Sequence, residues 1–259
     1  SDKDRLATFG LVMITGTVMC ILATPFVELP PPVIWGYLAV SVVVHNFYYF
    51  FLLRAYAHGD LSHVYPIARG LGPLLVAIFS GTLIGEHLSL AEASGVALVS
   101  LGILGLAFAK GWPRGGEWRP VFYAVCTGFT IASYTMLDGL GARASPSALS
   151  YIVWLNILEG PWVFVIAVYR RGSMMFDVFR GTAWRGIGGG IVATLGYGIG
   201  IWALSVGAMA HVAALRETSS LFGALIGAIV LHEAFGSRRI LAAVLIVAGL
   251  LMMHLPFLR

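Results

Sequence analysis

Four charged side chains lie within long apolar stretches of this chain: Arg69, Glu159, Arg216 and Glu217. A charge at the centre of a membrane helix costs about 2.5–3.5 kcal/mol on insertion scales, so each is a candidate for function. A guanidinium group can hold a carboxylate, and a carboxyl group within a membrane can carry a proton. The sequence therefore predicts that Arg69 and Arg216 border a central cavity and bind a substrate carboxylate. Glu159 and Glu217 are candidates for proton coupling.

Each of these residues also has a purely structural interpretation. The arginine side chains could extend to the membrane interface, or bond the last carbonyls of a neighbouring helix. Glu217 could bond an adjacent helix instead of carrying a proton. Glu159 lies beside Gly160 and Pro161. Because a proline frees a backbone carbonyl, a protonated Glu159 could simply donate a hydrogen bond there.

A second group of candidates contains polar aromatic and amide side chains that lie too deep for the membrane interface. They are His45, Tyr48, Tyr49, Tyr65, Tyr134, Asn156 and Tyr197. Polar atoms cannot be left in lipid, so these side chains are expected to face the helix bundle or a wet cavity. Tyr65 and Arg69 are four residues apart and share a helix face. Such a pocket suits an amphipathic organic solute, and the alternative is ordinary helix packing.

Aromatic residues near the ends of the apolar stretches have a different explanation. Tryptophan and tyrosine gather at both membrane–water interfaces, where one part of the ring is wet and the other apolar. The sequence assigns six residues to such a belt: Trp35, Trp112, Trp118, Tyr151, Tyr169 and Trp184.

The overall composition indicates a membrane protein. Hydrophobic residues make up 59% of the chain, charged residues 11%, and the mean hydropathy is +0.88. A soluble domain has about a quarter of its residues charged, because its surface must be wetted. The basic residues lie mostly between the apolar stretches, which favours a membrane topology over nucleic-acid binding.

The known catalytic and metal-binding patterns do not occur in the sequence. The two cysteines, Cys20 and Cys126, lie in apolar runs without metal-ligand spacing. No G-x-S-x-G, H-E-x-x-H or Walker sequence is present, so we expect no catalytic residues, no metal and no cofactor.

About 20 residues are needed for a helix to cross the hydrocarbon core. Nine stretches meet that test: 6–25, 33–56, 62–84, 90–110, 119–139, 148–169, 184–206, 209–231 and 239–258. Short turns separate them, so sequential helices must be antiparallel. The expected fold is an all-α polytopic bundle.

An internal repeat relates the two halves of the chain. Arg69 and Glu86 are 17 residues apart, as are Arg216 and Glu233, and the two pairs are offset by 147 positions. At nearly the same offset, 6–25 corresponds to 148–169, 33–56 to 184–206, 62–84 to 209–231 and 90–110 to 239–258. The stretch 119–139 has no counterpart, which predicts two repeats at 1–110 and 119–258, with a first helix absent from the chain.

A repeat of five helices crosses the membrane an odd number of times, so the second copy must enter the membrane in the opposite orientation. This is the inverted-repeat architecture of many alternating-access transporters. Of the sixteen Lys and Arg residues, twelve fall on one face and two on the other. The face with twelve is predicted to be cytoplasmic. That assignment puts the Arg259 end outside.

Two segments resemble the drug/metabolite transporter superfamily, and more narrowly its EamA-type members. They read H-G-D-L-S-H-V-Y-P-I-A-R-G-L-G-P-L at 58–74 and G-E-H-L-S-L-A-E-A-S-G-V-A-L-V-S-L-G-I-L at 85–104. In that family a Gly-Glu-(Arg/His) triplet ends a helix and leads into a polar turn and a glycine-rich helix. Gly85-Glu86-His87 matches the triplet, whereas the second copy, Leu231-His232-Glu233, lacks the glycine.

The resemblance covers nearly the whole chain. It implies ten helices in two inverted repeats and export of small metabolites from the bacterial cytoplasm. Amino acids, aromatic ones included, are among the cargoes of the family. It also implies that the absent first helix helps to line the cavity.

The sequence therefore predicts a secondary transporter that exports amino acids or similar zwitterions across the bacterial inner membrane. One arginine would hold the carboxylate while the tyrosines pack on the substrate side chain. Two other classes stay open. An intramembrane lipid-modifying enzyme would have to use Glu159 and Glu217, and a non-transporting membrane subunit would have no continuous cavity. The sequence does not predict the oligomeric state.

Overall fold

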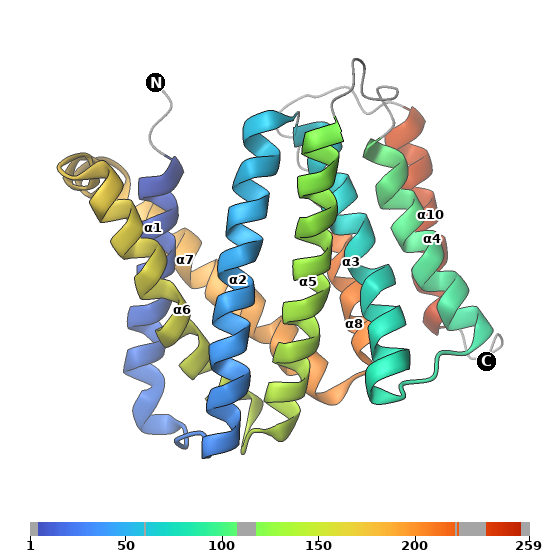
Figure 1. The fold of residues 1–259 in the computed structure, drawn as a ribbon, viewed down its shortest axis with the longest axis horizontal. Helices are drawn as coiled ribbons and strands as arrows, with labels where there is room; N and C mark the ends of the chain where they lie inside the picture. The colour runs from blue at the N-terminus through green and yellow to red at the C-terminus, as the bar shows by residue number, and fades with distance from the viewer. Residues whose placement is uncertain (1–4, 60, 108–117, 221, 223–236, 255–259) are drawn as a thin grey trace. The chain divides into compact units, whose positions relative to one another are not determined.

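The computed structural model describes residues 5–59, 61–107, 118–220, 222 and 237–254. These residues form helices joined by short turns, with no strand among them. The helices are α1 (Arg5–Ala23), α2 (Pro32–His58), α3 (Leu61–Ile84), α4 (Leu90–Ala107), α5 (Trp118–Ala144), α6 (Ala148–Arg171), α7 (Met174–Val206), α8 (Met209–Arg216) and α10 (Ser237–His254), with a 3₁₀ turn η1 at Thr24–Phe26 (Figure 1).

Seven of the described helices, α1 to α7, are long and apolar enough to cross a membrane. The prediction of an all-α polytopic membrane protein is confirmed. The predicted stretch 239–258 corresponds to α10, whose apolar part, Ile240–His254, is shorter than the other seven. The last four residues of that stretch lie outside the described residues.

Two helices extend beyond the predicted spans. α5 continues to Ala144 instead of ending at 139. Pro146 sets this end, because the residue before a proline is disfavoured in the α conformation. α7 begins at Met174 instead of 184, through a segment that contains Asp177 and Arg180. A test of apolar length excludes such polar residues, although they form helix without difficulty.

The prediction of a continuous helix over 209–231 is wrong at Glu217. α8 ends at Arg216, and the backbone N–H of Glu217 turns back to the carbonyl of Ala214 at 3.1 Å. Glu217 is a single turn residue, and Thr218, Ser219 and Ser220 after it are helical again. The hydroxyl of Thr218 donates to the Leu215 carbonyl at 2.7 Å. Residues 223–231 of the predicted span lie outside the described part.

The chain divides into two compact units. Unit 1 contains Ser1–Val43 and Leu137–Val206. In it α1 packs against α6 and α7. Gly186 and Gly190 of α7 lie on its contact with α1. A Cβ atom at Gly190 would come within 2.7 Å of the Val12 carbonyl oxygen, so only glycine permits this approach.

Unit 2 contains Val44–Met136 and Gly207–Arg259. In it α4 packs against α3 and α10, and α8 packs against α3 (Figure 1). Gly95 and Gly249 bring α4 and α10 together. A Cβ atom at Gly95 would lie 2.6 Å from the Gly249 carbonyl oxygen.

These units differ from the sequence halves 1–110 and 119–258, because each unit draws on both halves. Within the units, three pairs of predicted counterparts pack directly on one another. They are α1 with α6, α3 with α8, and α4 with α10.

Candidate functional site

Unit 2 contains a small cavity bounded by α3, α5 and α8. Its volume is about 10 Å³, which is room for about one water molecule. The lining residues are Arg69, Gly72, Pro73 and Val76 from α3, Ile131, Tyr134 and Thr135 from α5, and Ala213, Arg216 and Glu217 from α8 and its C-cap. Charged groups are costly in a membrane, so three of them around one cavity make this the candidate site.

An ion pair between α3 and the end of α8 dominates the cavity. Arg69 Nε lies 3.2 Å from Glu217 Oε2, and the two side chains are 22% and 4% exposed. Arg69 Nη2 also donates a hydrogen bond to Ser219 Oγ at 2.9 Å. Removing one partner of a buried pair costs about 3–5 kcal/mol, because the other charge is left uncompensated. The structural interpretation of Glu217, a bond to an adjacent helix, is what the structure shows.

The local sequence places these charges. Arg69 lies between Pro66 and Pro73 on α3. Each proline lacks a backbone N–H, so the helix on either side of Arg69 has one hydrogen bond fewer. Arg216 and Glu217 occupy the last turn and the C-cap of α8, where the chain leaves the helix. The break in α8 lets the side chains of both residues reach the cavity, although they are adjacent in sequence.

Aromatic side chains gather beside the cavity in unit 2. The His45 ring stacks on Tyr134 with centroids 4.2 Å apart. Tyr48 meets Tyr134 edge-on at 5.6 Å and lies 5.2 Å from Tyr49. On α3 the Arg69 guanidinium lies 5.7 Å from the centre of the Tyr65 ring. Five predicted site residues in addition to the charged ones therefore belong to the same unit as the cavity.

The remaining three predicted site residues lie in unit 1. The Asn156 side-chain amide donates to the Ile152 carbonyl at 2.9 Å, within α6. Glu159 is buried on α6, with 5% of it exposed. The Tyr197 hydroxyl donates to Asp138 Oδ2 at 2.5 Å.

Sequence reasoning missed Asp138, which is fully buried in unit 1. Besides Tyr197, Asp138 Oδ1 accepts hydrogen bonds from Ser41 Oγ at 2.5 Å and from the Tyr151 hydroxyl at 3.0 Å. The predicted span 119–139 put Asp138 at the membrane interface, where a carboxylate needs no explanation. Because α5 continues to Ala144, the residue lies inside the helix.

The same network corrects the aromatic belt. Tyr151 was assigned to the membrane interface, but it is fully buried and bound to Asp138. Trp118, Tyr169 and Trp184 are 65%, 90% and 71% exposed, as side chains facing lipid or the interface would be. Trp35 is half-buried and donates to the Pro30 carbonyl at 3.1 Å. Trp112 lies outside the described residues.

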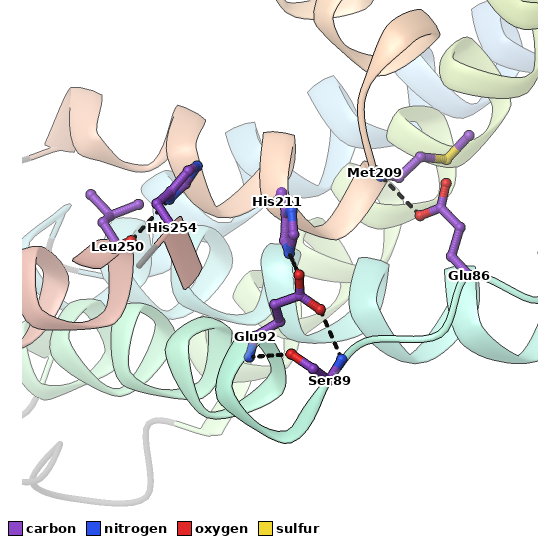
Figure 2. Close-up of polar contacts among 7 residues, drawn as sticks. All are labelled: Glu86, Ser89, Glu92, Met209, His211, Leu250 and His254. Atoms are coloured by element: carbon purple, nitrogen blue, oxygen red, sulfur yellow. Dashed lines mark hydrogen bonds and ion pairs between the residues drawn. The ribbon is translucent and has the colours of Figure 1, made fainter. Parts of the chain in front are cut away.

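The Gly85-Glu86-His87 triplet forms the turn between α3 and α4. Gly85 has φ +69°, a conformation that favours glycine. Glu86 Oε2 accepts a hydrogen bond from the backbone N–H of Met209 at 2.9 Å, so it caps α8 (Figure 2). Ser89 and Glu92 form a reciprocal capping box at the start of α4, with bonds of 2.8 and 3.2 Å.

Groups of three or more potential metal-ligating side chains do not occur in the part of the chain that the structure describes. Cys20 and Cys126 are free thiols.

Comparisons with known proteins agree on the kind of protein. The sequence model of the EamA-like transporter family matches residues 2–108 and 118–255. A Bacillus subtilis (strain 168) protein named "Uncharacterized transporter YdeK" is 30% identical over 210 residues, which is 66% of this chain and 72% of that protein. A solved crystal structure superposes on 97% of this chain and 89% of its own, with a TM-score of 0.77 at 21% identity. At that identity the structural likeness concerns the fold alone.

Proposed function

The chain belongs to the EamA-like transporter family, and we propose on that basis that it exports amino acids or similar zwitterions. That it is a multi-pass membrane transporter of small molecules follows from the family and the seven spans. The proposal adds the substrate class, the direction, the bacterial inner membrane as location, and an alternating-access mechanism. The observation that carries it is the charge set of the unit 2 cavity.

Two guanidinium groups and one carboxylate line this cavity. A zwitterionic amino acid carries one carboxylate and one ammonium group, so it can bond to a guanidinium group and to the carboxylate at the same time. Arg69 or Arg216 would bind the substrate carboxylate through paired N–H donors. Glu217 would bind the ammonium group. A substrate with both charges can contact both kinds of charged group in the cavity, whereas a singly charged metabolite can pair with one kind.

The described conformation has no room for such a substrate, because the cavity is about 10 Å³ and the Arg69 guanidinium is already paired with Glu217. Binding therefore requires the substrate to exchange with the internal pair. Its carboxylate replaces Glu217 on Arg69, and its ammonium group replaces Arg69 on Glu217. Each charge-assisted bond is worth about 1.5–3 kcal/mol, so the two bonds formed with the substrate offset the internal ion pair that is broken and the water contacts that the substrate gives up. Such an exchange couples substrate binding to the position of α8.

The aromatic cluster would receive the substrate side chain. Tyr134 lines the cavity, stacks with His45 and meets Tyr48 edge-on. Aromatic pairs prefer offset or edge-to-face contact and gain about 0.5–1.5 kcal/mol beyond area burial. Tyr49 and Tyr65 extend the same surface. This arrangement favours amino acids with a ring or a large apolar side chain. Asn156 and Tyr197 keep structural roles here, since their donors bond to Ile152 and Asp138.

Two inverted repeats, at 1–110 and 119–258, would supply the second conformation. Arg69 on α3 and Arg216 on α8 are counterparts in the proposed repeat, and both line the cavity. In an inverted repeat the two halves exchange conformations, which opens the same site first to one face and then to the other. Glu159, buried on α6, is a candidate for proton coupling in that cycle, as is Glu217.

Counterflow in proteoliposomes with a panel of amino acids, with and without a pH gradient, tests the proposal. Wild-type protein should exchange zwitterions and prefer aromatic ones. Arg69→Gln and Arg216→Gln should abolish exchange, and Tyr49→Ala and Tyr65→Ala should raise KM. Arg54→Gln is the matched control, because Arg54 is exposed on α2 beside Phe50. If Arg69→Ala, Tyr49→Ala and Tyr65→Ala all transport at wild-type rates, the proposed site is wrong.

The same preparation separates the other two classes. An intramembrane lipid-modifying enzyme would change the composition of the liposome lipids in a way that depends on Glu159 or Glu217. A non-transporting subunit would exchange no solute at all. The family and the transporter-named relative argue against both.

A further inference from the structure

Three ionisable side chains meet where α4, α8 and α10 come together in unit 2, away from the cavity. Glu92 Oε1 lies 3.4 Å from His211 Nε2, and the two side chains are 14% and 20% exposed. The His211 and His254 rings have centroids 6.1 Å apart. Figure 2 shows the Glu92 carboxylate between the α4 capping box and the His211 ring. One carboxylate thus ties the first turn of α4 to the first turn of α8.

The same turn of α8 has a second tie. Glu86 accepts the Met209 backbone N–H at 2.9 Å (Figure 2). α8 is only eight residues long, Met209–Arg216, or about 12 Å at 1.5 Å per residue. Its other end carries Arg216 and Glu217, both at the cavity. A short helix moves as a rigid rod, so a bond at its first turn influences where its last turn lies.

The ionisable groups around His211 are few in the described part of unit 2. Glu92 is the ionisable residue of α4, and Glu86 and His87 lie in the turn that precedes it. On α10 the neighbour is His254, at the end opposite Arg238 and Arg239. On α3, the helix that α8 packs against, His63, Tyr65 and Arg69 lie near the end remote from Glu86. Of all these, Glu92 is the group that contacts the His211 imidazole at ion-pair distance.

His254 on α10 is the ring that lies beside His211. Its Nδ1 bonds the Leu250 carbonyl at 2.9 Å, and because a carbonyl only accepts, Nδ1 carries the proton. The residue is exposed, and its ring lies against that of His211. The N-termini of α4 and α8 and the C-terminus of α10 face away from the predicted cytoplasmic side. The pH that the cluster senses would be the external one.

We propose that Glu92 and His211 are positioning residues for the cavity, and that protonation of His211 sets how firmly α8 is held. With imidazolium at position 211 the contact is an ion pair, and α8 stays where Glu217 bonds Arg69. With neutral imidazole the charge attraction is lost, and α8 moves more easily. This proposal rests on the proposed function, because its consequence is a change in substrate affinity.

The direction of the pH effect follows from the protonation state. The ion pair exists while the imidazole is protonated and is lost as rising pH removes that proton. At low pH the Glu92–His211 ion pair holds α8 in place, and Glu217 stays paired with Arg69. A substrate carboxylate must then displace Glu217 while that ion pair resists movement of α8. At high pH that displacement is easier. Raising the pH should therefore lower the KM of the transporter for its zwitterion.

Glu92→Gln separates the charge from the helix cap. Glutamine serves in a capping box as glutamate does, so Ser89 keeps its acceptor and α4 keeps its first turn. Only the charge opposite His211 is lost. His211→Gln removes the titrating group from the other side. His87→Gln is the matched control, because His87 is exposed in the neighbouring turn of the same unit.

The first test uses detergent-solubilised full chain and needs no substrate. Thermal unfolding of wild type, Glu92→Gln, His211→Gln and the double variant forms a mutant cycle. The coupling between the two sites should be larger at about pH 5.5 than at about pH 8, because an imidazole loses its charge as the pH rises. A coupling of the same size at both pH values, or none at either, would overturn the proposal.

The second test measures the KM for counterflow of an amino acid, with the same pH on both sides of the membrane so that no gradient acts. Between about pH 5.5 and 8 the wild-type KM should fall about five-fold, the lower end of usual coupling factors. His211→Gln and Glu92→Gln should flatten the profile, and His87→Gln should retain it. An unchanged profile in both variants contradicts the proposal. If no protein exchanges any amino acid, the proposed function fails while the unfolding cycle still decides this inference.

Discussion

The two units each bury a carboxylate, but they satisfy it by different means. In unit 1, Asp138 accepts hydrogen bonds from the hydroxyls of Ser41, Tyr151 and Tyr197. In unit 2, Glu217 pairs with the Arg69 guanidinium. Hydroxyl donors hold a carboxylate through hydrogen bonds within the protein, and a zwitterion does not present the matching partners. An ion pair can be exchanged for the charges of a ligand, because a zwitterion presents both partners at once.

This difference assigns different tasks to the two networks. The Asp138 network joins residues from α2, α5, α6 and α7 and acts as a structural tie. The Arg69–Glu217 pair lines a cavity and borders an aromatic cluster, which is where substrate is proposed to bind. The comparison predicts that damage to the first lowers stability, while damage to the second lowers both stability and transport.

The largest effect is expected for Arg69→Gln. It leaves Glu217 buried without its cation and should destabilise the protein by about 3–5 kcal/mol. The double variant Arg69→Gln/Glu217→Gln should recover much of this loss, because no buried charge is left alone, but it should not recover transport. Thermal unfolding and counterflow measure the two quantities separately. If the double variant unfolds as easily as Arg69→Gln alone, the pair is not a coupled unit.

Asp138→Asn should have the next largest effect. The asparagine amide puts N–H donors where a carboxylate oxygen accepted, so at least one of the three hydroxyls loses its acceptor. Loss of a bond to a charged group costs about 1.5–3 kcal/mol, which should appear as a lower Tm. Tyr197→Phe removes one donor and leaves the carboxylate, so its Tm should lie between those of Asp138→Asn and wild type.

Transport distinguishes the two carboxylates further. Asp138→Asn should leave the KM for the substrate near the wild-type value once the folded fraction is taken into account, whereas Arg216→Gln should abolish exchange. A high KM with an unchanged Tm in Asp138→Asn would break the comparison and move the substrate site to unit 1.

Helix crossings in unit 2 give a smaller effect. Gly95→Ala would put a methyl group 2.6 Å from the Gly249 carbonyl oxygen and 2.4 Å from Met253 Cγ, so α4 and α10 must separate. Overpacking of this kind costs about 1–3 kcal/mol. Gly105→Ala on the same helix is the control, because nothing lies within 4 Å of its Cβ position. Tm should fall for the first variant and stay level or rise for the second. Equal Tm values for both would show that the crossing tolerates separation.

Much of the fold could be predicted from composition and span length, since the bilayer fixes how long an apolar helix must be. The ends of the helices could not. Polar residues continue α7 toward Met174 and α5 toward Ala144, where only Pro146 stops the helix. The break at Glu217 interrupts the helix for one residue, and a test of apolar length does not detect an interruption that short.

The candidate site, too, could be predicted from the sequence only in part. Spacing could place Tyr65 and Arg69 on one helix face, because both lie on α3. No spacing rule relates Arg69 to Glu217, which lie 148 positions apart and meet only through the packing of α8 on α3. Asp138 was missed for a related reason. Its depth follows from where α5 ends, and its hydroxyl partners come from three other helices.

The smallest expected effect concerns Glu86, which caps α8 in unit 2 through a backbone bond to Met209 (Figure 2). Glu86→Ala removes the acceptor and should cost about 1 kcal/mol, as loss of a helix cap does. Glu86→Gln keeps an acceptor oxygen and loses only the charge, so it should cost a few tenths of a kcal/mol at most. Hydrogen exchange at the Met209 amide and the Tm report the two losses.

Near-wild-type behaviour of Glu86→Gln would show that a neutral acceptor suffices for a backbone tie. The need for charge in unit 2 would then be confined to the carboxylates that face a cationic side chain, Glu217 at Arg69 and Glu92 at His211. A Gln variant as damaged as the Ala variant would instead extend that need to Glu86.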